Sequence, residues 1–287
     1  MTFFRSAVAT LTSHTPMFKG KGRIVLFLDR MITNQYDPSS FIVAGPINGL
    51  AVINFDLRAW GQKFAFYYGE WESEFIDLTR QLYRGGTFID VGSSLGLYVC
   101  CLGDVVRRSG DRIASIEPLH FNLHRQKENV ALNKLQEVVT YHPVALGAEE
   151  SMLFISADAN ESDNNAYVSA EGDIAVPVTT LDRLVAQAGY AKVGFIKMDV
   201  EGFEPMVIVG GRECICRDHP AIFAEFNRER MLINQFEISP SWDFLMSEGY
   251  RAFEVKNRRL RPLSEPAEVE NIFFLPAHFQ IPQRCLT

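Results

Sequence analysis

The amino-acid sequence predicts an α/β protein whose helices cover both faces of a doubly wound, mostly parallel sheet of seven strands. From residue 87 onward, short apolar runs alternate with segments of helical periodicity, a pattern typical of crossover units in a parallel sheet. Several of these runs end in an acidic residue, as expected where strands bring ligand-binding side chains to one edge. The last two runs are joined by a short polar connection, which predicts an antiparallel pair at one edge of the sheet.

The expected elements follow one another in a regular order. The predicted strands cover residues 87–91, 112–116, 138–145, 193–200, 220–227, 250–255 and 271–276. The predicted helices cover residues 95–108, 121–134, 203–213 and 239–248. A polar, turn-rich stretch at about 147–175 interrupts the alternation and is predicted to be a variable insert.

The region before the first strand of the sheet has a different pattern. Residues 1–80 are predicted to form a small N-terminal extension that packs on the core, and residues 81–287 the main domain. Within the extension, residues 49–57 and 63–68 are expected to be strands, and residues 72–83 an amphipathic helix.

Composition narrows the range of ligands and locations. The 287 residues carry a net charge of −7, which argues against nucleic-acid binding and favours neutral or cationic small ligands. The five cysteines show no paired spacing, which predicts reduced thiols and a cytoplasmic location. The apolar stretch 23–32 is shorter than the roughly 20 residues that span a bilayer. It is expected to be a helix packed on the core, with a helix on a membrane surface as the alternative.

A glycine turn follows the first strand of the sheet in the stretch "FIDVGSSLGLY" (88–98). The spacing of Gly92 and Gly96 lacks the third glycine of a dinucleotide fingerprint, and no lysine completes a phosphate-binding loop. The carboxylate of Asp90 would repel a pyrophosphate, but it would suit a ligand that carries an ammonium or sulfonium group. The turn therefore predicts a cationic ligand without a phosphate.

Two further strand ends carry acidic residues. Glu117 ends the second strand, 21 residues after Gly96, where a carboxylate can accept both hydroxyl groups of a ribose. The alternative for Glu117 is a surface glutamate at a strand end. In "KMDVEGFE", an extended chain would place Lys197, Asp199 and Glu201 on one face. Charges in a buried strand are costly unless they are paired or used, so these residues are candidates for a site.

The alternative for this cluster is structural. Lys197 and Asp199 would form an ion pair, and Glu201 would cap the next helix. Glu225, near the end of strand 220–227, adds another carboxylate at the same edge of the sheet. We therefore expect the acidic strand ends to converge on one rim.

The order and spacing of these motifs resemble the FkbM-type methyltransferases. The matching motifs, within residues 66–276, are "FIDVGSSLGLY", "IEPLHFNLHRQKENVALN", "PVALG", "VPVTTLDRL", "IKMDVEGFEPMVIVGG" and "AIFAEFN". The resemblance implies a Rossmann-like class I methyltransferase fold that uses S-adenosylmethionine, most often to methylate a hydroxyl group. Asn129 and Asn133 stand where the family places its asparagines. Ser93-Ser94 replaces the usual Ala-Asn, and Asn227 stands where many members have histidine.

The resemblance also implies roles for particular residues. Asp90 and the turn would face the methionine end of the cofactor, with backbone amides at the helix N-terminus holding its carboxylate. Glu117 would bind the ribose hydroxyls, Ala145 would lie near the adenine, and Glu72 in "YGEWE" would touch the cofactor. The implied contacts of the turn are Gly92, Ser93, Ser94 and Gly96.

Methylation of a hydroxyl requires a way to remove its proton. Asp199 and Glu201 are the candidate general bases, and Lys197 would position them or balance their charge. The sequence predicts no metal site. If a divalent cation such as Mg²⁺ takes part, Asp199, Glu201 and Glu225 are its candidate ligands. The expected acceptor is a hydroxyl of a small molecule or glycan, recognised by the insert and the N-terminal region.

Three other functions remain open. A methyltransferase acting on a protein or another nitrogen acceptor would keep the cofactor site and change the acceptor pocket. A nicotinamide-dependent oxidoreductase shares the fold class but requires the missing third glycine. A non-catalytic scaffold on this fold predicts lost cofactor residues, whereas Asp90, Gly92, Gly96 and Glu117 are present.

Overall fold

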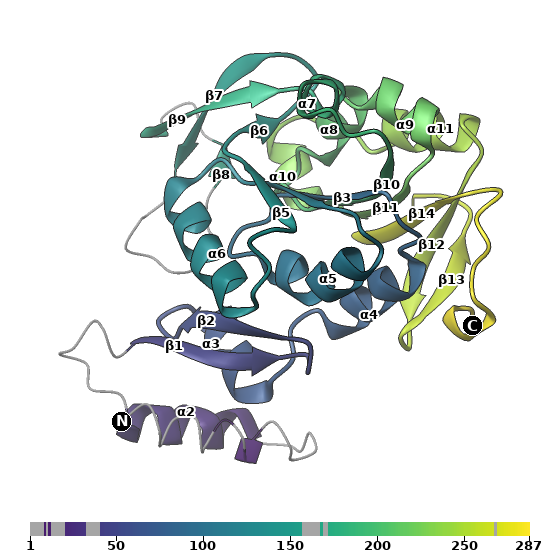
Figure 1. Ribbon diagram of the computed structural model, residues 1–287. Coiled ribbons are helices and arrows are strands. Elements are labelled where there is room, and N and C mark those ends of the chain that lie inside the picture. The colour runs from purple at the N-terminus through teal and green to yellow at the C-terminus, as the bar shows by residue number, and fades with distance from the viewer. Residues whose placement is uncertain are drawn as a thin grey trace.

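The central sheet of the computed structural model has eight strands (Figure 1). The structure describes residues 9, 11–12, 21–32, 41–156, 167–168, 172–266 and 269–287. In spatial order the strands of this sheet are β13 (Arg259–Leu263), β12 (Tyr250–Lys256), β14 (Asn271–Pro276), β11 (Ala221–Glu225), β10 (Val193–Met198), β3 (Thr87–Val91), β4 (Ile113–Ile116) and β5 (Val139–His142). The strands from β11 to β5 are parallel, and β14, β12 and β13 are joined by antiparallel pairing. The predicted α/β fold with an antiparallel edge is confirmed.

The eighth strand corrects the prediction of seven. Strand β13 comes from the polar connection between the last two predicted strands, which folds back on β12 as a hairpin. Asn257 and Arg258 at its tip both have positive φ, 53° and 62°. Two successive left-handed residues match the right-handed twist of the flanking strands, as in a type I′ turn. The sequence concealed this turn because its second residue is arginine and not glycine.

Helices cover both faces of the sheet (Figure 1). One face is packed by α4 (Ser73–Leu82), α5 (Leu97–Arg108) and α6 (His120–Leu132). The other face is packed by α7 (Leu181–Ala188), α8 (Glu204–Val209), α9 (Arg212–Asp218), α10 (Arg228–Ile233) and α11 (Ser239–Ser247). Because both faces are covered, the strands are apolar on both sides. Phe88 and Phe195 stack toward the first face, and Ile89 and Ile196 pack toward the second.

The single helix predicted over 203–213 is two helices, α8 and α9. The break falls at Gly210 and Gly211. A Cβ atom on Gly210 would lie 2.0 Å from the carbonyl oxygen of Gly147, so the two segments of backbone approach closely at this point. The break is therefore set by a tertiary contact.

The N-terminal region forms a separate layer below α5 and α6 (Figure 1). It contains α2 (Lys21–Ile32), the antiparallel pair β1 (Ile42–Ile47) and β2 (Ala51–Asp56), and α3 (Trp60–Tyr68). The side chains of Asn129 and Asn133 on α6 accept hydrogen bonds from the backbone of Asn54 and Val52. These asparagines therefore attach β2 to the main body of the protein.

One element of this layer was predicted wrongly. Residues 63–68 were expected to be a strand, but they belong to α3. Trp60, Phe64 and Tyr68 lie at intervals of four residues. The ring centroids of Trp60 and Phe64 are 4.6 Å apart, and those of Phe64 and Tyr68 are 5.4 Å apart. This spacing of aromatic residues is helical, and it was hidden by the other aromatic residues between them. The helices predicted over 23–32 and 72–83 are confirmed as α2 and α4.

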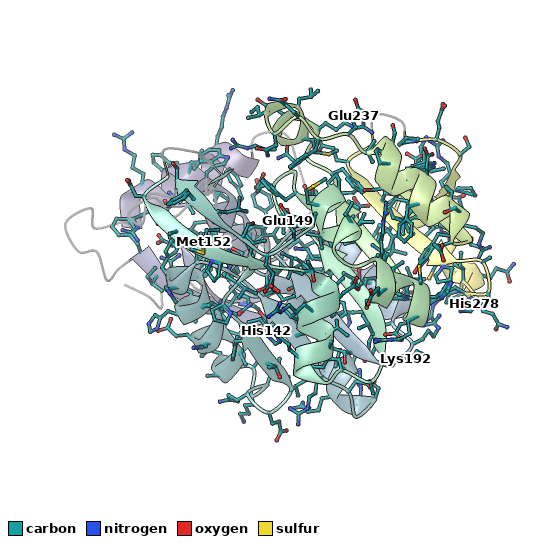
Figure 2. The ribbon with its side chains drawn as sticks, turned by 90° about the horizontal axis from the view of Figure 1, so that it is seen from above. His142, Glu149, Met152, Lys192, Glu237 and His278 are labelled. Carbon is teal, nitrogen blue, oxygen red and sulfur yellow. The ribbon has the colours of Figure 1, made fainter. Side chains whose placement is uncertain are left out.

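The predicted turn-rich insert is partly a second sheet. Strands β6 (Ala145–Leu146), β9 (Ile174–Thr179), β7 (Ser151–Ser156) and β8 (Tyr167–Val168) pair in this order. The strand predicted over 138–145 is divided between β5 and β6, because Pro143 has no N–H to continue the ladder. Residues 157–166 and 169–171 of the insert lie outside the described residues. Met152 of β7 and His278 near the C-terminus mark opposite sides of the molecule (Figure 2).

Candidate active site

The glycine turn after β3 is present as predicted. Its glycines allow segments from β10 and α6 to approach the backbone of the turn closely. Gly92 has φ +73°, and a Cβ atom there would lie 1.8 Å from the carbonyl oxygen of Asp199. Gly96 has φ +84°, and a Cβ atom there would lie 2.7 Å from the side chain of Gln126. Gly92 thus lets the end of β10 approach the end of β3, which brings Asp90 and Asp199 to one place.

The two serines of the turn have different environments. The Ser93 hydroxyl is buried, 2.7 Å from the Ser115 hydroxyl, and accepts a hydrogen bond from Gln126 Nε2 at 2.8 Å. Ser94 has φ +47°, and its backbone N–H donates to Glu117 Oε2 at 2.9 Å. The turn is therefore tied to β4 and α6 through Ser93, and to the end of β4 through Ser94.

Glu117 is buried, not on the surface. Its Oε1 also accepts hydrogen bonds from the Leu119 backbone N–H and from Asn122 Nδ2. Burial raises the pKa of its carboxyl group, against these hydrogen bonds. The surface alternative for Glu117 is wrong, and the carboxylate lies directly beside the glycine turn.

A buried lysine lies at the centre of the acidic rim. Lys197 Nζ is 3.6 Å from Asp90 Oδ1, 3.4 Å from Asp199 Oδ2 and 3.4 Å from the Gly92 carbonyl oxygen. It also lies 5.0 Å from the centroid of the Tyr98 ring. Asp90 is 1% exposed, and neither of its oxygens has a hydrogen-bond partner within the described part of the chain. Burial raises the pKa of Asp90 to about 6, with the charge of Lys197 opposing the rise.

The region after β10 differs from the prediction. The strand ends at Met198, and Glu201 has φ +53°, so the extended chain that would align it with Lys197 and Asp199 does not persist. Glu201 accepts a hydrogen bond from Asn227 Nδ2 at 2.8 Å. Glu201 does not cap α8, which has no side-chain cap at Phe203; the Oε1 of Glu204 instead accepts from the backbone N–H groups of Val200 and Gly202 and fixes the turn before the helix. Sequence reasoning missed Glu204, although a glutamate before the proline of a first helical turn was a usable signal.

Glu225 lies at the end of β11, close enough to interact electrostatically with Asp199, Glu72 and Lys197. Burial raises the pKa of its carboxyl group to about 8, and the charges of Asp199 and Glu72 add to the rise. The cluster therefore holds more carboxyl groups than its one lysine can balance. Excess negative potential of this kind favours a cationic ligand.

Tyr98 is a second residue that sequence reasoning missed. Its hydroxyl is buried in the first turns of α5 and donates to Glu72 Oε2 at 2.8 Å. Glu72 has φ +48°, and burial raises the pKa of its carboxyl group, with Lys197 opposing. The signal for Tyr98 was a polar group two residues after the glycine turn. Glu72 thus joins the rim from an element that precedes the sheet.

The remaining predicted residues lie at the margins of the rim. Ala145 packs in a small apolar cluster with Leu119, two residues beyond Glu117. His142 bonds through Nε2 with the Tyr190 hydroxyl at 2.8 Å. Among the described residues, no group of three or more His, Cys, Asp or Glu side chains is arranged to hold a metal ion. Asp199, Glu201 and Glu225, the candidate ligands named above, are not arranged as such a group.

No helix in the described residues is both long enough and apolar enough to cross a membrane. The stretch 23–32 lies within α2, which has 12 residues.

The chain is similar to known methyltransferases. The family model "Methyltransferase FkbM domain" matches residues 90–252. The 2-O-methyltransferase NoeI of Sinorhizobium fredii is 25% identical over 122 residues, which cover 41% of this chain and 50% of that protein. This chain thus spans about half the length of the curated relative it matches.

Two solved structures are also similar. The methyltransferase FkbM from Methylobacillus flagellatus KT has a TM-score of 0.44 at 17% identity, over 75% of this chain and 52% of that one. An O-methyltransferase from Bacillus cereus in complex with SAH has a TM-score of 0.43 at 12% identity, over 96% and 98%. The family model alone matches more than half of the 287 residues, and this chain belongs to the FkbM methyltransferase family.

Proposed function

We propose that this protein transfers the methyl group of S-adenosylmethionine to a hydroxyl oxygen of a small molecule or glycan. The observation that carries the proposal is the carboxylate of Asp90, which is buried beside the glycine turn without a hydrogen-bond partner among the described residues. Its ion pair with Lys197, at 3.6 Å, leaves both oxygens without a hydrogen bond from the described part of the chain, and such a buried carboxylate is costly unless a ligand completes it. The ammonium group of the cofactor's methionine end would do so.

The other proposed cofactor contacts are those that the family resemblance implies, and the arrangement of the rim supports them. The carboxylate of the cofactor would meet backbone N–H groups at the start of α5, with Gly92, Ser93, Ser94 and Gly96 forming the turn beneath it. Glu117 would accept the ribose hydroxyls. Ala145 would contact the adenine, and Glu72 would lie beside the sulfonium. When bound, the cofactor supplies a methyl group already activated by its positive sulfur.

This chain's own residues would then align and deprotonate the acceptor. An aliphatic hydroxyl becomes a good nucleophile only as its proton leaves, so a general base near the methyl group is needed, and the carboxylates of the rim can serve as one. Asp199 is the best placed, because its side chain is one-third exposed while Lys197 holds its other side. Lys197 would orient Asp199, and Glu201 would support it from the following turn. Asp199 would take the proton of the acceptor hydroxyl as its oxygen bonds to the methyl group and the sulfur leaves with the electron pair of its bond to that group.

Two further observations favour an oxygen acceptor and a cytoplasmic location. The curated relative NoeI is named a 2-O-methyltransferase, which supports a hydroxyl over a nitrogen acceptor. None of the five cysteines forms a disulfide, as expected for a protein that works in a reducing compartment.

The test is a calorimetric titration of S-adenosylhomocysteine, with NAD titrated in parallel. We expect saturable binding of S-adenosylhomocysteine only, weakened in Glu117→Ala by roughly 1–3 kcal/mol, the scale of a charge-assisted hydrogen bond. Binding of NAD instead would show that the strand-end carboxylates serve an oxidoreductase. An absence of binding by both ligands would refute a cofactor site at this rim.

A further inference from the structure

A groove opens beside Glu72, outside the glycine turn. Its volume is about 420 Å³, and it lies between the N-terminal end of α4 and the turn that joins β12 to β13. The side chains used below are Glu70, Trp71, Glu72, Glu74, Phe75 and Arg258. No residue on this list except Glu72 has a role in the site described above.

Glu72 connects the groove with the methyl-transfer site. It lines the groove, and its carboxylate accepts the hydrogen bond of the buried Tyr98 hydroxyl. Its charge also acts on Glu225 at the end of β11. A non-glycine residue at φ +48° is strained, and such strain is concentrated at functional sites. Glu72 is therefore the residue that the groove and the rim share.

The walls of the groove are fixed by the fold. The backbone N–H and C=O of Trp71 are both bonded to the side chain of Asn48, at 2.9 and 2.8 Å. Phe75 stacks on Phe223 of the sheet with centroids 5.3 Å apart. On the opposite wall, Arg258 donates to Asp77 Oδ2 at 2.8 Å and to Ser73 Oγ at 3.2 Å. A preformed groove binds a ligand at a lower entropic cost than a flexible one.

The lining combines aromatic rings with carboxylates. Trp71 and Phe75 offer apolar surface, and Glu70, Glu72 and Glu74 offer hydrogen-bond acceptors. A sugar has both matching features, since it presents C–H groups on its ring faces and hydroxyl donors around its edge. The single guanidinium, Arg258, is already engaged with Asp77. The net negative lining would repel a phosphate, a uronic acid or a nucleic acid.

We propose that this groove is the acceptor site and that it takes an uncharged glycan, whose reacting hydroxyl passes Glu72 to reach the rim. The proposal rests on the methyltransferase function proposed above. It assigns acceptor choice to residues 70–75, which fall at the end of the predicted N-terminal region, and to the β12–β13 turn, and it gives the insert no part.

The test measures transfer of a labelled methyl group from S-adenosylmethionine to p-nitrophenyl glucoside, galactoside and mannoside. The matched anionic probe is p-nitrophenyl glucuronide, which differs from the glucoside by one carboxylate. We expect transfer to at least one neutral glycoside, and a kcat/KM for the glucuronide lower than for the glucoside by about tenfold or more. Affinity for S-adenosylhomocysteine is titrated on the same preparations.

Variants locate the acceptor in the groove. We expect Trp71→Ala to raise KM for the neutral glycoside by about tenfold or more, while affinity for S-adenosylhomocysteine changes less than about twofold. Trp60→Ala, an exposed tryptophan on α3, is the matched control and should change neither. Because Trp71 also touches the core, Glu74→Gln is the second variant. It should reduce discrimination against the glucuronide, a ratio that a folding defect does not alter, and Glu128→Gln on α6 should not.

The outcomes separate the two proposals. Binding of S-adenosylhomocysteine without transfer to any neutral glycoside would overturn the groove assignment and leave the cofactor site standing. Equal transfer to glucuronide and glucoside, or equal effects of Trp71→Ala and Trp60→Ala, would also overturn it. A protein that does not bind S-adenosylhomocysteine would refute the methyltransferase function, and the acceptor site with it.

Discussion

Lys197 Nζ lies 3.6 Å from Asp90 Oδ1, and the two side chains are 4% and 1% exposed. The pair joins the ends of β10 and β3, which are adjacent and parallel. Lys197 also faces Asp199 and the Tyr98 ring, so one cation serves several partners. The negative charges around it raise the pKa of Lys197, which keeps it protonated despite its burial. This single buried cation holds the acidic rim together.

Replacement of Lys197 should therefore destabilise the protein strongly. In Lys197→Met, Asp90 and Asp199 lose their shared counter-charge, and breaking such a buried pair costs about 3–5 kcal/mol. Lys256→Met, an exposed lysine at the end of β12, is the control, with an expected change of less than about 0.5 kcal/mol. Urea denaturation measures both free energies of unfolding. Equal effects of the two variants would mean that Lys197 does not hold the rim.

Replacement of Asp90 should separate ligand binding from stability. Its pKa is raised to about 6, so the folded state disfavours the ionised form, and Lys197 keeps Asp199 as a partner. Asp90→Asn should leave the free energy of unfolding at pH 7 unchanged or higher. Its affinity for S-adenosylhomocysteine should fall by about 1.5–3 kcal/mol, the scale of a hydrogen bond to a charged group. A large loss of stability with unchanged affinity would contradict the proposed role of Asp90.

The carboxyl group of Glu225 should make stability fall as pH rises. Its pKa is about 8 in the folded protein against an ordinary value of 4.5, so the folded state binds the proton more tightly. The resulting stabilisation is fully present below pH 4.5 and is lost as pH rises through about 8. Urea denaturation across this range should show a smaller decline in Glu225→Gln than in the natural protein. Identical slopes would exclude a raised pKa at Glu225.

Titration of the rim carboxyl groups should change the affinity for S-adenosylmethionine more than the affinity for its product, S-adenosylhomocysteine. Protonation of Asp90 and Glu225 removes negative charge from the rim below their pKa values of about 6 and about 8. S-adenosylmethionine carries a sulfonium charge that S-adenosylhomocysteine lacks. As pH rises from 5 to 8, the affinity for S-adenosylmethionine should therefore increase relative to the affinity for S-adenosylhomocysteine. Calorimetry at several pH values measures both affinities. A ratio independent of pH would place the sulfonium away from these carboxyl groups.

Gly92 and Gly110 give a matched test of the close approach at the turn. Both have positive φ, but a Cβ atom on Gly92 would collide with the Asp199 carbonyl, and one on Gly110 would meet nothing within 4 Å. Gly110→Ala should lower the free energy of unfolding by about 1–2 kcal/mol, the cost of placing an alanine in the left-handed conformation. Gly92→Ala should cost more, because the end of β10 must move. Urea denaturation measures the free energy of unfolding of both variants. Comparable losses would show that the end of β10 moves away from residue 92 at little cost.

The sequence by itself determined the fold class and most of the rim. Alternation of apolar strands and helices required a parallel sheet, and parallel strands end at one edge. Asp90, Glu117, Asp199 and Glu225 lie at or just after the carboxyl ends of four parallel strands, so the sequence predicted that they reach one edge of the sheet. The glycine turn was equally readable, because Gly92 and Gly96 are needed where the backbone is left-handed and crowded.

Only the tertiary structure decided how these side chains are used. The chain leaves the extended conformation after Met198, so Glu201 bonds to Asn227, and Glu204 bonds to the backbone of the turn before α8. The contact between Tyr98 and Glu72 spans 26 residues, and no local pattern encodes it. The pKa values depend on burial and on neighbours from several elements, which exist only after folding. Local rules specify which residues reach the rim, whereas packing between distant segments specifies their partners and their charge.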